Sequence, residues 1–95
     1  MNNDTILTIL KVDLQITAPA YDSLLRQNIN LARKAIEREG IKLRDNDEDG
    51  MLVEMYAAWL SRKRKENIPM NRMLRYMLNN RLLSERMKTK DEEES

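Results

Sequence analysis

The chain has 95 residues, of which 41% are hydrophobic and 35% are charged, and it contains neither cysteine nor histidine. This length predicts a single domain, and the apolar fraction is too high for an intrinsically disordered chain. Without cysteine the chain cannot form disulfides or thiolate metal sites, and without histidine it lacks the commonest general base and metal ligand. No segment is apolar for long enough to cross a bilayer, so we expect no membrane partner and a cytoplasmic protein at synthesis.

Helix-forming residues dominate the composition. Only two Gly, two Pro and no Phe accompany abundant Leu, Met, Arg, Lys, Glu and Ala, which predicts an all-α fold. The net charge of +1 hides a segregation along the chain, because residues 1–90 hold 17 basic and 12 acidic side chains and residues 91–94 add four acidic ones. We expect one four-helix domain over residues 1–88 and a disordered, frayed acidic tail over residues 89–95.

The first helix is expected at about residues 4–14, with Asn3 or Asp4 as its N-cap. Apolar and polar residues also alternate from Leu10 to Ile16, which is the period of a half-buried strand. We favour a helix followed by an extended exit, because a lone strand would have no partner.

A second helix is expected at about residues 20–39. Pro19 suits the first turn of a helix, and Gly40 supplies a left-handed stop at its end. Apolar residues recur between them at helical spacing, and the predicted core residues are Leu25, Ile29, Ala32 and Ile36.

An acidic connector follows the second helix. Part of it resembles the first half of an EF-hand calcium loop, but position twelve of that loop should be a bidentate Glu and is Tyr56. We therefore expect no metal and a solvated acidic turn that suits the N-terminus of the next helix. The residues of this candidate acidic partner surface are Asp45, Asp47, Glu48 and Asp49.

Two further helices are expected at about residues 50–65 and 69–87, with Pro69 restarting the chain as a helix. The short connection predicts that they are antiparallel neighbours. Asn79 and Asn80 are weak helix formers that either lie on the surface or contact a neighbour. The predicted core residues of the two helices are Leu52, Met55, Tyr56, Trp59, Leu60, Met73, Leu74, Met77 and Leu78.

Basic residues gather where these last two helices meet. Three roles are compatible with them: contact with phosphates, a solvated helix end that complements the macrodipole, or a subunit interface. In the third, the basic end of one copy meets the acidic connector of the next, and such head-to-tail contacts can close a ring. The candidate interface or DNA-channel residues are Arg62, Lys63, Arg64, Lys65, Arg72 and Arg75.

Catalytic motifs are missing from the sequence, which has no glycine-rich phosphate loop and no metalloprotease motif. We therefore expect a protein that is not an enzyme and that needs no cofactor. One alternative is a small nucleic-acid-binding regulator that uses its last two helices as a helix-turn-helix-like pair.

Two long strings carry a resemblance to a known family. They are MYAAWLSRKRK at residues 55–65 and MLRYMLNNRLLSERM at residues 73–87, with Pro69 between them. Both resemble the small helical head-tail connector proteins of tailed phages and of prophages in Gram-positive bacteria, which are also called head-completion, adaptor or DNA-packaging proteins. The strings AYDSLL and ARKAIEREGI extend the resemblance to about residues 4–88.

The resemblance implies a structural subunit without catalytic residues. Such subunits form a ring on the portal protein, extend the DNA channel, help to retain packaged DNA and allow the tail to attach. The implied partners are the portal protein, further copies of the chain, a tail-side completion protein and, without sequence specificity, the packaged DNA. The implied location is the host cytoplasm during assembly and then the head-tail junction of the virion.

Overall fold

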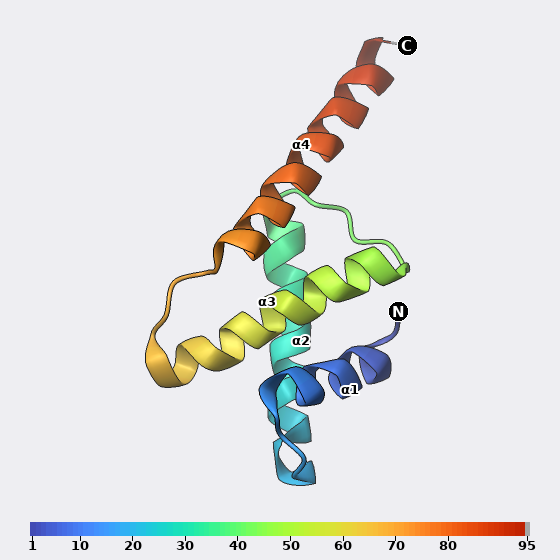
Figure 1. The fold of residues 1–95 in the computed structure, drawn as a ribbon. Coiled ribbons are helices and arrows are strands. Elements are labelled where there is room, and N and C mark those ends of the chain that lie inside the picture. The colour runs from blue at the N-terminus through green and yellow to red at the C-terminus, as the bar shows by residue number, and fades with distance from the viewer. Residues whose placement is uncertain (95) are drawn as a thin grey trace.

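The chain is all-helical in its computed structural model, which describes the main chain of residues 1–94 and the side chains of residues 1–88 (Figure 1). No strand occurs within residues 1–94, so the all-α prediction is confirmed. The elements in chain order are α1 (Asn3–Leu14), the 3-10 turn η1 (Pro19–Tyr21), α2 (Asp22–Arg38), α3 (Asp47–Glu66) and α4 (Arg72–Glu94).

Helix α1 begins one or two residues earlier than expected. The side chain of Asn2 accepts a hydrogen bond of 2.8 Å from the amide of Thr5, so Asn2 is the N-cap and the predictions of Asn3 and Asp4 are wrong. At its other end Gln15 adopts a left-handed conformation with φ of 58°. The chain then leaves in an extended conformation through Ala18, as expected of a helix followed by an extended exit.

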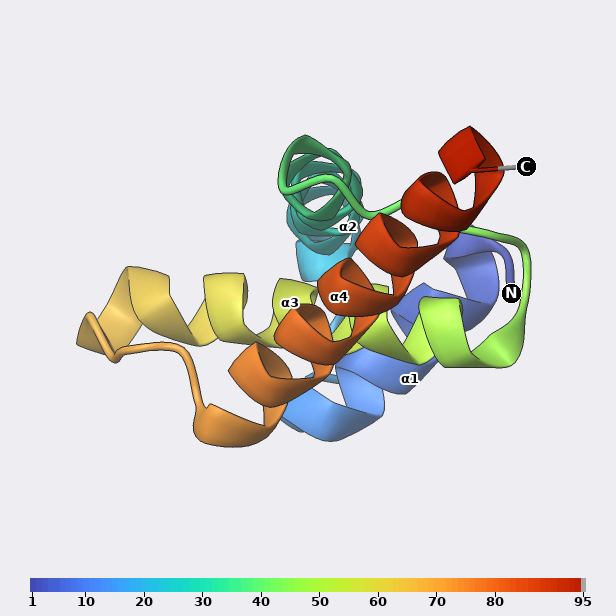
Figure 2. The same ribbon diagram turned by 90° about the horizontal axis from the view of Figure 1, so that it is seen from above.

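Helix α2 follows a single 3-10 turn that starts at Pro19. Its four predicted core residues, Leu25, Ile29, Ala32 and Ile36, are all buried. Gly40 has a φ of +107°, the left-handed conformation that was predicted to end this helix. Figure 2 looks down α2 and shows that α1 and α3 both run across it.

Helix α3 is longer than predicted, because it starts at Asp47 rather than at Gly50. The side chain of Asn46 accepts a hydrogen bond of 2.8 Å from the amide of Asp49 and caps the helix. Asp47, Glu48 and Asp49 therefore form the first helical turn, where negative charge is favourable, and only Asp45 lies in the connection before it. Helix α3 contacts α1, α2 and α4, which makes it the centre of the fold.

The buried face of α3 differs from the predicted stripe of large side chains. Val53, Ala57 and Ala58 are fully buried, because their small side chains let α1 and α2 approach closely. Leu52 is also buried, as predicted. The other predicted core residues of this helix pack at the edges of the core and are only half-buried: Met55, Tyr56, Trp59 and Leu60.

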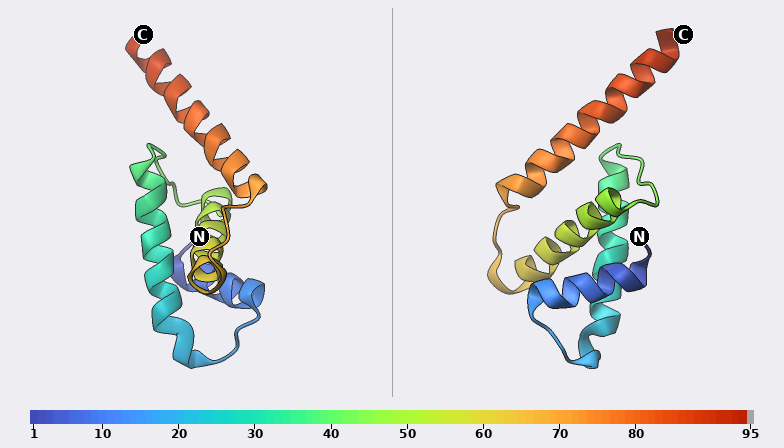
Figure 3. Two further views of the ribbon diagram at one scale, coloured as in Figure 1. Left: turned by 90° about the vertical axis from the view of Figure 1, so that its left-hand side faces the viewer. Right: turned by 45° about the vertical axis from the view of Figure 1, so that its right-hand side comes forward.

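Helix α4 begins at Arg72, where the side chain of Asn71 accepts a hydrogen bond of 2.7 Å from the amide of Leu74. Pro69 therefore lies in the connection and does not start the helix. Helix α4 runs back over α3 at an angle and carries the C-terminus beyond the other helices (Figure 3). The molecule is accordingly elongated, with extents of 52 × 26 × 17 Å.

One face of α4 packs against the core. Leu74 and Leu78 are buried and Met77 is half-buried, as predicted, but Met73 is 61% exposed and does not belong to the core. The main chain stays helical through Glu94, beyond the predicted helix end at residue 87. A helical main chain at residues 89–94 does not agree with the disordered tail predicted there, while the side chains of these residues and all of residue 95 lie outside the described residues.

Candidate interaction surfaces

The structure divides the six basic candidates among different partners. Arg62 donates a hydrogen bond of 3.1 Å to Asp13 of α1, and Arg75 donates one of 2.9 Å to Glu39 at the end of α2. The ammonium group of Lys63 lies 4.8 Å from the centre of the Trp59 ring, in cation–π contact. These three cations thus contribute to the fold of the chain itself.

The other three basic candidates are exposed: Arg64, Lys65 and Arg72. None of them forms an ion pair with any other described residue. Their charges are therefore available to a partner molecule, and the predicted basic surface is smaller than the sequence indicates.

The predicted acidic surface loses one of its four members, because Asp49 is buried with only 2% of its surface exposed. Both of its carboxylate oxygens accept hydrogen bonds from Arg81, and one also accepts a hydrogen bond of 2.6 Å from the amide of Arg44. Arg81 also donates to the carbonyl of Lys42 and to Glu85. Asp49 therefore joins α3 to α4, and the prediction that it faces a partner is wrong.

Burial works against ionisation of Asp49, but the hydrogen bonds from Arg81 and Arg44 outweigh it and hold its pKa below the ordinary value. Both carboxylate oxygens of Asp49 are bound by Arg81, which also argues against a role for Asp49 as a calcium ligand in an EF-hand. Among the side chains that the structure describes, no group of three acidic residues is arranged to hold a metal ion.

Asp45, Asp47 and Glu48 remain exposed at the start of α3, where Asp45 contacts the amino group of Met1 at 2.7 Å. These three residues are what is left of the predicted acidic surface.

Glu54 is a buried acidic residue that the sequence analysis did not identify. It lies on α3 near Asp13 of α1 with 3% of its surface exposed, and one of its oxygens has no hydrogen-bond partner. Burial, followed by the hydrogen bond and the negative charge of Asp13, raises its pKa to about 7, while Arg62 acts in the opposite direction. In the sequence, Ala57 and Ala58 lie three and four residues after Glu54, on the same side of the helix, which is a signal of its burial.

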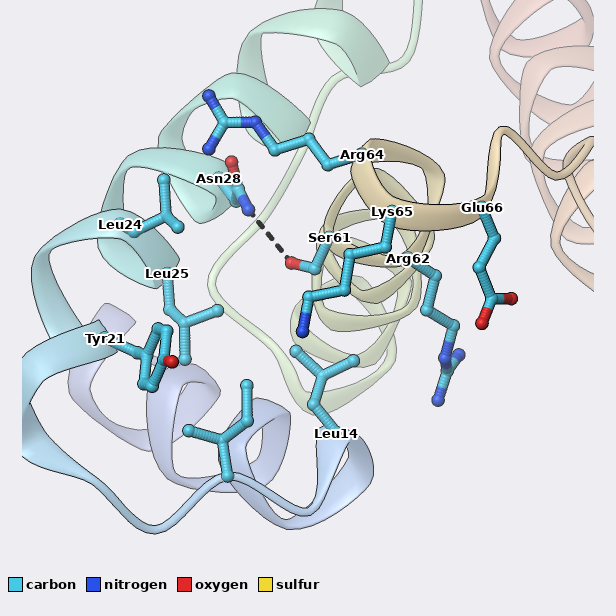
Figure 4. A pocket seen from close by; sticks show the side chains of 11 residues that line it. Leu14, Tyr21, Leu24, Leu25, Asn28, Ser61, Arg62, Arg64, Lys65 and Glu66 are labelled. Atoms are coloured by element: carbon cyan, nitrogen blue, oxygen red, sulfur yellow. Dashed lines mark hydrogen bonds between the residues drawn. The ribbon is translucent and has the colours of Figure 1, made fainter.

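A pocket of about 220 Å³ opens between the end of α1, the start of α2 and the end of α3 (Figure 4). Its floor is apolar and includes Leu14, Leu24 and Leu25. At its side, Asn28 donates a hydrogen bond of 2.9 Å to the hydroxyl of Ser61. We call this site the basic-rimmed pocket, because Arg62, Arg64 and Lys65 line it together with Glu66.

Helix α4 presents a second apolar face to the outside. Met73, Tyr76, Leu83 and Met87 are each between 58% and 64% exposed. They lie three, seven and four residues apart, a spacing that places them on one side of a helix. Asn79 and Asn80 are also exposed, which is the first of the two placements considered for them. We call the four apolar residues the outer face of α4.

Comparison of the chain with protein families, with curated proteins and with solved structures gives no match. Within the described residues, every helix is too short or too polar to serve as a membrane span.

Proposed function

We propose that the chain is a non-enzymatic structural protein, a head-tail connector subunit that assembles on the portal of a tailed phage. The outer face of α4 is the observation that carries this proposal. Single exposed apolar residues are normal on a protein surface, but four on one side of one helix form a patch that favours a protein partner. All four lie in the string at residues 73–87 on which the family resemblance rests.

The distribution of free charge supports assembly from several copies. Arg64 and Lys65 lie in the last two turns of α3, and Asp47 and Glu48 lie in its first turn. A helix of 20 residues spans about 30 Å, so these opposite charges lie at two ends of each subunit. Such a subunit suits head-to-tail contacts, which form a ring when the rotation between copies closes. Surface charges of this kind steer assembly more than they stabilise it.

The test is association with the cognate portal protein, measured by native mass spectrometry and light scattering with and without portal. We expect a complex that contains several copies of the chain for each portal. Failure to associate at any salt concentration would contradict the proposal. Monomeric behaviour of the free chain would not, because in the family that the chain resembles ring closure can depend on the portal.

A pair of matched variants tests the contribution of α4. Leu83→Glu places a charge on the outer face, and Val12→Glu places the same charge on α1 at a residue that is 75% exposed. We expect Leu83→Glu to weaken assembly on the portal at least about tenfold, because the charge is buried without a partner where the outer face packs against portal or against another copy, and Val12→Glu to leave it unchanged. Equal effects of the two variants would exclude the outer face as the contact.

The alternative role as a nucleic-acid-binding regulator predicts a different result. Such a protein would bind duplex DNA with an affinity that falls steeply with salt and depends on the free cations. Strong duplex binding that is lost in Arg64→Ala, Lys65→Ala and Arg72→Ala, together with no portal association, would favour the regulator. Arg62 and Arg75 are unsuitable for this test, because their substitution would also break ion pairs within the fold.

A further inference from the structure

We propose that the basic-rimmed pocket receives the C-terminal part of α4 from a second copy of the chain. In this contact Leu83 and Met87 of one copy cover the apolar floor of the pocket in the other. The acidic residues 91–94 that follow then meet Arg64 and Lys65 at its rim. The inference deepens the proposed function and rests on it in one respect, since both require copies of the chain to associate.

The floor of the pocket indicates an apolar ligand. Leu14 and Leu24 are only half-buried there, although they come from different helices and converge on one site. A volume of about 220 Å³ far exceeds the roughly 10–15 Å³ that a single water molecule needs. The pocket therefore has room for bulky apolar side chains, which gain more than water from contact with such a surface.

The rim of the pocket indicates that the ligand is also acidic. Lys65 extends across the pocket toward Leu14, and Arg64 reaches over Asn28 (Figure 4). Neither of these two cations forms an ion pair with a described residue. Arg62 is already engaged with Asp13, and Glu66 is the one acidic residue among those that line the pocket. The rim thus offers an excess of positive charge directly beside an apolar surface.

The C-terminal part of the chain combines the two required properties. Leu83 and Met87 are 58% and 60% exposed and are four residues apart on α4. The sequence then continues into four consecutive acidic residues at positions 91–94. The other acidic segment, residues 45–49, fits less well because Asp49 is buried against Arg81.

The occupant comes from a second copy because a subunit cannot fill its own pocket in this fold. The pocket lies where α1 ends and α2 begins, whereas the end of α4 lies at the opposite extremity of the molecule (Figures 1 and 3). Each copy then offers one pocket and one helix end. Contacts between two different surfaces are heterologous and link copies head to tail.

Chemical crosslinking between two full-length variants tests the contact, and the absence of native cysteine makes it specific. Glu66→Cys places a thiol at the rim of the pocket, and Lys88→Cys places one beside Met87. The two variants are mixed at the highest concentration at which they stay soluble, and again on portal, and are treated with a short bismaleimide. The control mixture replaces Lys88→Cys with Thr5→Cys, an exposed residue of α1.

We expect the first mixture to give at least about tenfold more crosslinked dimer than the control, and equal yields in both conditions would overturn the inference. Adding Arg64→Glu and Lys65→Glu to the Glu66→Cys variant should remove this excess of crosslinked dimer. Glu92→Lys with Glu93→Lys in the other variant should then restore it, which a merely misfolded pocket would not allow. No rescue by the charge exchange would also count against the contact.

Portal association of the unmodified chain is measured in parallel. Association with portal but no specific crosslink would overturn this contact and leave the proposed function standing. A specific crosslink without portal association would support this contact and contradict the proposed function.

Discussion

Asp49 and Glu54 are both acidic residues of α3 and both are almost completely buried, with 2% and 3% of their surfaces exposed. Their pKa values nevertheless shift in opposite directions. Asp49 accepts hydrogen bonds from Arg81 and from a backbone amide, so its charged form is stabilised and its pKa falls. Burial raises the pKa of Glu54 to about 7, and the neighbouring carboxylate of Asp13 adds to the rise, which the positive charge of Arg62 does not offset.

The comparison shows that the partners of a buried acid, and not its burial alone, decide its charge. An ionised carboxylate in the interior loses its hydration, and only a well-placed cation or several donors replace it. Asp49 has both and holds α4 to α3. Glu54 shares the single guanidinium of Arg62 with Asp13, which is not enough for two charges.

The largest expected effect comes from removing the partner of Asp49. Arg81→Ala should lower the free energy of unfolding by about 3 to 4 kcal/mol at pH 7, because it leaves a buried charge without its cation. Urea unfolding followed by circular dichroism measures this loss. Arg86→Ala is the matched control on an exposed residue of the same helix, and it should cost no more than about 0.5 kcal/mol. Similar losses in the two variants would mean that the Asp49–Arg81 pair does not hold α4 in place.

A second prediction removes the charge of Glu54. Since its pKa is higher in the folded protein than its ordinary value of 4.5, the folded state binds more protons between about pH 4.5 and 7. The stability of the unmodified protein therefore falls as pH rises through this window. Glu54→Gln should abolish that decline and stabilise the protein by about 2 kcal/mol at pH 8, with little effect at pH 4.5.

Urea midpoints measured across this pH range check the prediction. Glu66→Gln, an exposed residue of the same helix, is the control and should keep the decline. If Glu54→Gln kept it too, another group would be responsible.

The smallest expected effect comes from the neighbour of Glu54. Asp13→Asn removes a negative charge but leaves the burial of Glu54, which is the larger cause of its raised pKa. The upper end of the pH range in which stability declines should therefore move down, with a gain of about 1 kcal/mol at pH 7 that the loss of the exposed Asp13–Arg62 ion pair partly offsets. Asp4→Asn, on the same helix, removes an exposed ion pair to Arg26 and should not move this pH. An unchanged decline in Asp13→Asn would mean that Asp13 does not contribute to the raised pKa of Glu54.

Much of the fold was predictable from local patterns. The apolar spacing of α2 identified its core, and Gly40 marked its end, because both features depend on residues close together in the chain. The helix starts were less predictable. Asn2, Asn46 and Asn71 each cap a helix, but nearby polar residues and Pro69 were equally plausible candidates.

The candidate site was less predictable than the fold. Arg64 and Lys65 were among the six basic candidates, but the sequence does not distinguish them from Arg62, which pairs with a residue 49 positions away. The pocket was missed entirely, because its floor comes from residues of α1 and α2 and its rim from the end of α3. Such convergence depends on how the helices cross, which no local pattern records.

By itself, the sequence determined that the chain forms helices, how many there are and roughly where each lies, because propensity, capping and apolar spacing act over a few residues. The tertiary structure alone decided that the large side chains predicted for the core of α3 lie at its edges and that the outer face of α4 stays exposed. It also decided the roles of the charges. Asp49 and Arg81 are 32 residues apart in the chain and meet only after α4 packs on α3. The strength of an ion pair depends on the distance in space between the two charges, which the sequence does not give.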